Sequence, residues 1–231
     1  MEQHSAAQGM RDRIIRGDCI EVMRDMPTGS VDFVLTDPPY IAHYRDRSGR
    51  SVANDDNGAW LAPAFREAAR VLKDNRFCVS FYGWPQADRF LAAWRDAGLR
   101  PVGHLVWVKF YHSNREPRFL KYRHEAAYLL AKGSPRPTRV INDVLAWEYS
   151  GNRLHPTEKA VGTMGLLIES YSRPGDTVLD PFAGSGTSAV AARELGRHYI
   201  GIELDPRHAE TARMRLAAKV APKNDSDYHH G

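Results

Sequence analysis

Short apolar runs rich in β-branched residues alternate along the chain with windows whose apolar residues recur at helical spacing. The apolar runs predict strands at residues 13–16, 31–36, 77–82, 104–109, 126–131, 177–179 and 199–202. The amphipathic windows predict helices at residues 60–73, 85–97, 160–171, 187–195 and 206–219. Because strands alternate with helices, the pattern favours an α/β fold with one sheet of seven strands, most of them parallel.

Several residues mark the ends of the predicted helices. Gly98 and Gly196 each follow a helical window, and Asp205 stands as an N-cap before a proline at the first helical position. Two long segments, residues 41–59 and 133–154, follow neither the helical nor the strand pattern. Loops of this length within a compact domain usually have a function.

Composition narrows the class of protein. A chain of 231 residues with 42% hydrophobic and 26% charged residues suits a single globular domain. Cys19 and Cys78 are the only cysteines, which is too few for a disulfide framework or a zinc site built on thiolates. We therefore expect no metal and a protein of the reducing cytoplasm. The first twelve residues lack the apolar run of a signal peptide, and no stretch is long enough to cross a membrane.

The formal net charge of +4 is unevenly distributed. Residues 109–139 contain eight basic and two acidic side chains, interleaved with five aromatic ones. This profile favours a nucleic-acid surface, and a solvated face is the alternative. The candidate DNA-binding residues are Lys109, Arg115, Arg118, Lys121, Arg123, Arg136 and Arg139.

A glycine-rich turn follows the predicted strand that ends near Asp180. Gly184 and Gly186 allow a tight turn and a close approach to a ligand, while free amides at the following helix start favour an anion. The next strand ends in Glu203, where a carboxylate can accept hydrogen bonds from both hydroxyls of a ribose. The spacing predicts a nucleotide-type binding site. It is neither a P-loop nor a dinucleotide fingerprint.

A second group of chemical residues, Asp37, Pro38, Pro39 and Tyr40, follows the strand predicted at residues 31–36. The two prolines fix the backbone, so the Asp37 carboxylate and the Pro38 carbonyl become two rigid acceptors. Two acceptors suit an exocyclic amino group, and the Tyr40 ring suits a base swung out of its stack. A rigid turn with a core tyrosine is the structural alternative.

These motifs resemble those of the beta group of S-adenosylmethionine-dependent DNA amino-methyltransferases. The resemblance rests on the Asp-Pro-Pro-Tyr sequence at 37–40, His-Pro-Thr-Glu-Lys at 155–159 and Leu-Asp-Pro-Phe-Ala-Gly-Ser-Gly-Thr at 179–187, in that order. Residues 15–19, 106–109 and 124–125 extend it over nearly the whole chain. It implies a Rossmann-like methyltransferase fold with helices on both faces of the sheet and a circularly permuted motif order.

The resemblance also implies a role for individual residues. The methionine part of the cofactor S-adenosylmethionine would contact Asp180, Phe182, Ala183, Gly184, Ser185, Gly186 and Thr187. Its carboxylate would contact His155, Thr157 and Lys159. Its ribose would bind Glu203, and Asp18 would contact its adenine amino group.

The implied organisation is one domain over residues 1–231. A catalytic half covers about 13–132, a target-recognition segment about 133–154, a cofactor half about 155–219 and a tail 220–231. This chain has Ala160 where the family commonly has proline, and its target-recognition segment is very short. We therefore expect little sequence readout. Arg136, Arg139 and Asn142 are the candidate readers, and residues 41–59 could add contacts.

The combined interpretation is a DNA adenine-N6 methyltransferase that acts on double-stranded DNA after base flipping. Asp37 favours adenine, whereas serine there is commoner in cytosine-N4 enzymes, which remain the alternative. RNA or protein amide methyltransferases usually have asparagine at this position, and a non-catalytic module would have lost the proline pair or the glycine turn. A cytoplasmic, nucleoid-associated protein is expected. A homodimer stays open, and any restriction nuclease would be a separate chain.

Overall fold

The computed structural model describes residues 9–41, 57–110, 119–147 and 159–218. Its strands are β1 (Arg13–Arg16), β2 (Val31–Thr36), β3 (Leu72–Phe81), β4 (Arg100–Val108), β5 (His124–Lys132), β6 (Val144–Ala146), β7 (Thr177–Asp180) and β8 (His198–Glu203). Its helices are α2 (Cys19–Arg24), α3 (Leu61–Val71), α4 (Ala87–Asp96), α5 (Val161–Tyr171), α6 (Thr187–Glu194) and α7 (Pro206–Ala217), with a 3-10 turn η1 (Trp84–Gln86).

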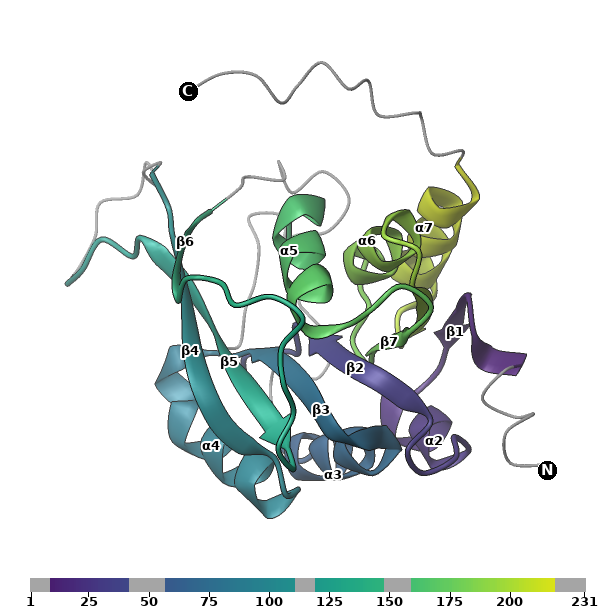
Figure 1. The fold of residues 1–231 in the computed structure, drawn as a ribbon, viewed down its shortest axis with the longest axis horizontal. Helices are drawn as coiled ribbons and strands as arrows, with labels where there is room; N and C mark the ends of the chain where they lie inside the picture. Colours follow the sequence, from purple (N-terminus) through teal and green to yellow (C-terminus); the bar gives the residue numbers. More distant parts are fainter. Residues whose placement is uncertain (1–8, 42–56, 111–118, 148–158, 219–231) are drawn as a thin grey trace.

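The strands form one sheet in the order β1-β8-β7-β2-β3-β5-β4-β6 (Figure 1). Strand β5 runs antiparallel to β3 and β4, while the other neighbouring strands run parallel. Parallel strands at the centre of such a sheet are covered on both faces, and every residue of β2 is buried. The mostly parallel α/β fold that the sequence predicts is confirmed.

Helices cover both faces of the sheet, with α2, α3 and α4 on one side and α5, α6 and α7 on the other (Figure 1). The first face packs around Phe65 and Trp94, whose rings meet edge to face at 5.9 Å. On the second face, Tyr171 of α5 packs against Phe33 and Phe77. Among the described residues, no helix is long and apolar enough to cross a membrane.

The sheet has one strand more than the seven that the sequence predicts. The additional strand, β6, lies inside the segment 133–154, which was expected to be irregular, and Val144 pairs with Val106 of β4. With three residues and two exposed side chains, β6 carries too little periodicity to be recognised. Strand β3 also begins earlier than residue 77, at Leu72 directly after α3, and the six-residue helix α2 was not predicted.

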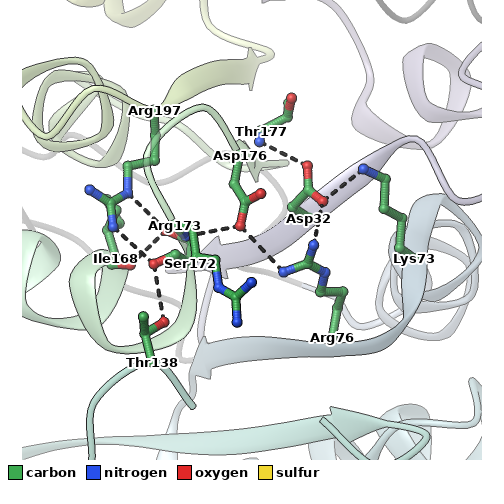
Figure 2. A network of polar contacts seen from close by, with 10 residues as sticks. All are labelled: Asp32, Lys73, Arg76, Thr138, Ile168, Ser172, Arg173, Asp176, Thr177 and Arg197. Atoms are coloured by element: carbon green, nitrogen blue, oxygen red, sulfur yellow. Dashed lines mark hydrogen bonds and ion pairs between the residues drawn. The ribbon is translucent and has the colours of Figure 1, made fainter. Parts of the chain in front are cut away.

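A polar network ties the amino ends of the central strands together (Figure 2). Asp32 of β2 is 3% exposed, and its carboxylate contacts Lys73 Nζ at 2.7 Å and an Arg76 guanidinium nitrogen at 3.0 Å. It also accepts a hydrogen bond of 3.0 Å from the backbone amide of Thr177, the first residue of β7. Arg76 in turn pairs with Asp176 at 3.3 Å. Strands β2, β3 and β7 are thus held in fixed register at this edge.

Candidate active site

The candidate site lies where the chain changes direction across the sheet. Strands β2 and β7 are central neighbours, paired at Phe33 with Val178 and at Val34 with Leu179. From β2 the chain continues to β3 on one side, and from β7 it continues to β8 on the other. Open α/β sheets bind ligands in the crevice at the carboxyl ends of such strands. Asp37 and Asp180, each at the end of one of these strands, therefore meet at one crevice.

The Asp37 carboxylate is held by two side chains. One carboxylate oxygen accepts a 2.8 Å hydrogen bond from the Tyr40 hydroxyl, and the other forms an ion pair with Lys159. The Lys159 ammonium also donates to the Tyr40 hydroxyl at 3.4 Å. Burial, together with the nearby Asp37 charge, raises the pKa of Tyr40 well above its ordinary value, so Tyr40 remains a hydroxyl donor. Tyr40 and Lys159 therefore fix the orientation of the carboxylate.

Aromatic rings surround the Lys159 ammonium, whose residue is only 6% exposed. The nitrogen lies 4.8 Å from the centre of the Phe81 ring, 5.7 Å from that of Tyr40 and 6.0 Å from that of Trp147. Such rings attract a cation that has lost water. Phe81 and Trp147 are site residues that sequence reasoning missed. A lone aromatic residue at a strand end gives no signal that separates it from the core.

Lys159 was predicted to bind the carboxylate of the cofactor, together with His155 and Thr157. In the structure, Lys159 contacts Asp37. His155 and Thr157 lie outside the described residues. The assignment of these three residues to the cofactor remains a prediction, and Lys159 is positioned to connect the two predicted halves of the site.

The glycine turn and Glu203 form one unit at the carboxyl end of β8. The Glu203 carboxylate accepts 2.8 Å hydrogen bonds from the backbone amides of Gly184 and Asp205. Gly186 has φ +80°, and a Cβ there would lie 2.8 Å from Ala212 Cβ, so a side chain would be strained and crowded. Each carboxylate oxygen keeps a second acceptor position, which suits ribose hydroxyls. The turn and Glu203 therefore fit a nucleoside with a small anionic group.

Asp18 lies at the neighbouring strand end. Its side chain caps α2 by accepting a 2.8 Å hydrogen bond from the amide of Ile20, and the preceding Gly17 amide donates to the Glu203 carbonyl at 3.0 Å. The cap explains why α2 begins here, since an N-cap satisfies one of the free amides of the first turn. Asp18 is thus beside Glu203, and its predicted contact with the adenine of the cofactor stays a prediction.

Asp180 is a buried acid at the centre of the crevice. It accepts hydrogen bonds from the Ser188 hydroxyl and from the backbone amide of Phe182, the latter at 3.1 Å. Both donors are neutral. Burial, with a smaller effect from the charge of nearby Asp37, raises the pKa of Asp180 to about 7. Asp180 therefore exchanges its proton near neutral pH in the folded protein.

The predicted DNA-binding residues divide between the two edges of the sheet. Lys121 and Arg123 are exposed just before β5, at the edge that holds Asp37, and Lys109 pairs with Glu125. Arg136 and Arg139 are exposed at the opposite edge, where the Arg139 amide donates to the carbonyl near the end of α5. Because an eleven-residue helix is about 16 Å long, the structure does not bring these two arginines to the crevice.

Arg115 and Arg118, the other two predicted DNA-binding residues, lie outside the described residues.

Both cysteines are buried free thiols, and burial raises the pKa of Cys19 to about 12 and that of Cys78 further above its ordinary value. Neither is therefore a ready thiolate, which a covalent attack on a base would need. Within the described part of the chain, no cluster of His, Cys, Asp or Glu side chains could hold a metal ion.

The sheet order, the crevice at its switch point and the glycine turn beside Glu203 together define a Rossmann-like methyltransferase. More narrowly, the chain belongs to the DNA methylase family N6_N4_Mtase, which matches residues 31–152 and 139–214. Its cofactor is therefore S-adenosylmethionine, and its substrate is DNA. The motif resemblance found in the sequence is confirmed at the level of this family.

Several known proteins are similar to this chain, and one of them is solved with S-adenosyl-L-methionine. Over 207 residues the chain is 54% identical to "Putative methylase YubD" of Escherichia coli (strain K12), covering 89% of this chain and 90% of that protein. A "Putative DNA Modification Methylase" of Thermus thermophilus, solved with S-adenosyl-L-methionine, is 25% identical with a TM-score of 0.69, covering 89% of this chain and 94% of that one. The cytosine-N4-specific PvuII DNA methyltransferase has a TM-score of 0.72 at 19% identity, over 87% of this chain and 84% of its own. The fold alone therefore does not distinguish adenine N6 from cytosine N4.

The buried Asp180 makes a prediction about stability and pH. The folded chain keeps its proton up to about pH 7, whereas an unfolded aspartic acid loses it near pH 4. The folded state therefore binds more protons in this range, so the Asp180 contribution to stability is largest below pH 4 and declines as pH rises to 7. The decline is at most about 1.4 kcal/mol per pH unit.

Asp180→Asn removes this titration while keeping an oxygen for the Phe182 amide and a polar group for Ser188. Urea unfolding of both proteins between pH 5 and 8 measures the effect. The free energy of unfolding of the wild type should fall relative to that of the variant up to pH 7 and then level off. A difference that is the same at every pH would contradict the raised pKa of Asp180.

Proposed function

We propose that this DNA methylase transfers the methyl group to the exocyclic N6 of adenine in double-stranded DNA, after the base has swung out of the helix. The observation that carries the proposal is the Asp37 carboxylate, held by Tyr40 and Lys159 at the switch-point crevice. A carboxylate offers about four acceptor positions. Two are used by the neighbouring side chains, which leaves acceptors for the hydrogens of an amino group.

The chemical difficulty lies in the amino group, whose lone pair is delocalised into the base. When Asp37 and the Pro38 carbonyl accept hydrogen bonds from this amino group, they favour a tetrahedral geometry at the nitrogen, in which the lone pair points towards the methyl group to be transferred. Pro38 and Pro39 keep these acceptors rigid, and the Tyr40 ring supports the base. S-adenosylmethionine supplies the sulfonium methyl group when it is bound. In the transfer, the new N–C bond would form as the methyl–sulfur bond breaks with its electron pair remaining on sulfur, and the proton lost from nitrogen would pass by way of the Asp37 carboxylate to solvent.

The cofactor half of the proposal uses the unit formed by the glycine turn and Glu203. Glu203 would hold the ribose hydroxyls and Asp18 the adenine amino group, since both stand at neighbouring strand ends. The backbone of the turn would hold the methionine part, through the residues from Asp180 to Thr187. The carboxylate of the cofactor would be bound by His155, Thr157 and Lys159.

Cytosine N4 is the alternative target, because its amino group presents the same two hydrogens, and a cytosine-N4-specific enzyme shares the fold. Asp37 supports adenine over cytosine. The deciding experiment incubates the purified protein with S-adenosylmethionine and DNA free of modified bases, and identifies the methylated nucleoside by mass spectrometry. N6-methyl-2′-deoxyadenosine supports the proposal, whereas N4-methyl-2′-deoxycytidine would replace it with the alternative. Sequencing of the modified bases then gives the target site.

Asp37→Asn should lower the rate of methyl transfer by about a hundredfold or more, because it removes a charged acceptor aimed at the reacting amine. The variant keeps an oxygen that can accept a hydrogen bond from Lys159 but removes the counter-charge of this buried ammonium, so a lower melting temperature is also expected. Cofactor affinity, measured by calorimetry, should be unchanged. Asp74→Asn, at a side chain that is 84% exposed, is the matched control. Full activity of the Asp37 variant would remove Asp37 from the mechanism.

Glu203→Ala should weaken cofactor binding by roughly tenfold to a hundredfold, since charge-assisted hydrogen bonds contribute about 1.5–3 kcal/mol. The same change leaves the amides of Gly184 and Asp205 without their acceptor, so a lower melting temperature is also expected. Glu210→Ala, at an acid with a 62% exposed side chain on α7, controls for loss of charge. An unaltered dissociation constant would place the ribose elsewhere.

Replacing Lys121 and Arg123 together by alanine should weaken DNA binding on all sequences alike. Each lost phosphate contact should reduce the log–log salt slope by about 0.9. Arg66→Ala with Arg95→Ala, on exposed positions of α3 and α4, forms the matched control pair. A slope that does not change in the Lys121 and Arg123 variant would make these residues a solvated face. A third variant, with Arg136 and Arg139 replaced by alanine, tests whether DNA also contacts the opposite edge of the sheet.

A further inference from the structure

Two large aromatic side chains are stacked on the surface near the crevice. Trp84, the first residue of η1, is 59% exposed, and Tyr122, two residues before β5, is 60% exposed. Their ring centres are 6.0 Å apart and their planes differ by 27°. We call Trp84 and Tyr122 the aromatic pair. Offset stacking at this separation gives the two rings a common orientation before any ligand is present.

The aromatic pair lies at the same edge of the sheet as Asp37. Gly83, which directly precedes Trp84, packs so tightly on the turn after β2 that a Cβ would lie 2.6 Å from the Tyr40 carbonyl oxygen. Tyr122 reaches the same edge because β5 runs antiparallel to β3, with Ala127 paired to Phe81 near the end of β3. The pair is therefore adjacent to the backbone of Tyr40 and not on a remote face.

The surroundings of the pair combine apolar surface with positive charge. Phe119 is 79% exposed and Leu120 is 67% exposed, next to the exposed Lys121, and Arg123 follows Tyr122. Exposed apolar side chains close together in the sequence and beside positive charge are candidates for a binding surface. Aromatic side chains flanked by cationic ones suit a ligand that carries many negative charges and also has planar aromatic groups. A nucleic acid has this chemistry, since every base has a face on which an aromatic ring can stack.

We infer that the aromatic pair stacks on the base that directly neighbours the flipped adenine on the same DNA strand. The inference rests on the proposed function, because a flipped base leaves its neighbour without a stacking partner on one side. The neighbouring nucleotide is also covalently tied to the one held at Tyr40, so it must lie next to this part of the protein. The aromatic pair thus replaces the stacking surface that the duplex loses.

The test compares three variants of Trp84 in equilibrium binding to a duplex that carries the methylation site of the wild type. Trp84→Leu keeps apolar bulk but removes the aromatic face, Trp84→Phe keeps a face, and Trp84→Ala removes both. Base–aromatic stacking predicts that the alanine and leucine variants bind about tenfold to a hundredfold more weakly, while phenylalanine restores most of the affinity. Met214→Ala, at a 66% exposed position on α7, is the matched control and should bind like the wild type.

A fluorescent base locates the contact. With 2-aminopurine next to the target adenine, emission should be quenched in the wild-type complex and should rise in Trp84→Leu. Quenching that occurs only with 2-aminopurine opposite the target, on the other strand, would overturn the inference. Equal affinities of the wild type and Trp84→Leu for the duplex would also overturn the inference. The same holds if Trp84→Phe binds the duplex no more tightly than Trp84→Leu.

Failure of this inference and failure of the proposed function give different results. If the wild type methylates adenine but Trp84→Leu binds the duplex normally, only the role of the aromatic pair is wrong. Suppose instead that the wild type methylates no adenine in the DNA, yet Trp84→Leu still binds that DNA more weakly. The proposed reaction is then wrong, and the stacked base cannot be assigned as the neighbour of a target adenine.

Discussion

The pairing of β2 with β7 is the constraint on which the site depends. It joins two strands that are far apart in the sequence and places the carboxyl end of one beside that of the other. The chain leaves them in opposite directions across the sheet, which makes this point the topological switch point where open α/β sheets bind ligands. Asp32 fixes the same pair from the opposite edge by accepting a hydrogen bond from Thr177 (Figure 2).

The sequence predicts those parts of the structure that local pattern determines. Strands β1 and β2 have the predicted bounds because β2 is an uninterrupted buried run, and the start of α7 follows from the N-cap Asp205. The acids at strand ends were predicted for the same reason, since a motif and its strand are neighbours in sequence. What local pattern cannot give is pairing between distant segments, such as the short edge strand β6 on β4.

Lys159 shows this limit within the site itself. Its motif suggested a carboxylate of the cofactor, yet the structure pairs its ammonium with Asp37, 122 positions away along the chain. Trp84 and Tyr122 were missed as a pair for a related reason, because only the antiparallel course of β5 brings Tyr122 beside η1. The first contact joins the end of β2 to the segment that precedes α5, and the second joins η1 to the segment that precedes β5. The resemblance named the residues, whereas the fold determines their neighbours.

Asp32 and Asp180, which lie at opposite edges of the sheet, differ in their partners, whereas Asp37 at the carboxyl edge pairs with the cation Lys159. At the amino edge, Asp32 is neutralised by Lys73 and Arg76, an arrangement that holds strands together. At the carboxyl edge, Asp180 receives hydrogen bonds from the neutral Ser188 hydroxyl and a backbone amide, and its pKa rises to about 7. Cations at the first edge stabilise the fold, because a buried charge without a partner is costly. Asp180 lacks a cationic partner and instead retains a proton to higher pH, because burial disfavours its charged form.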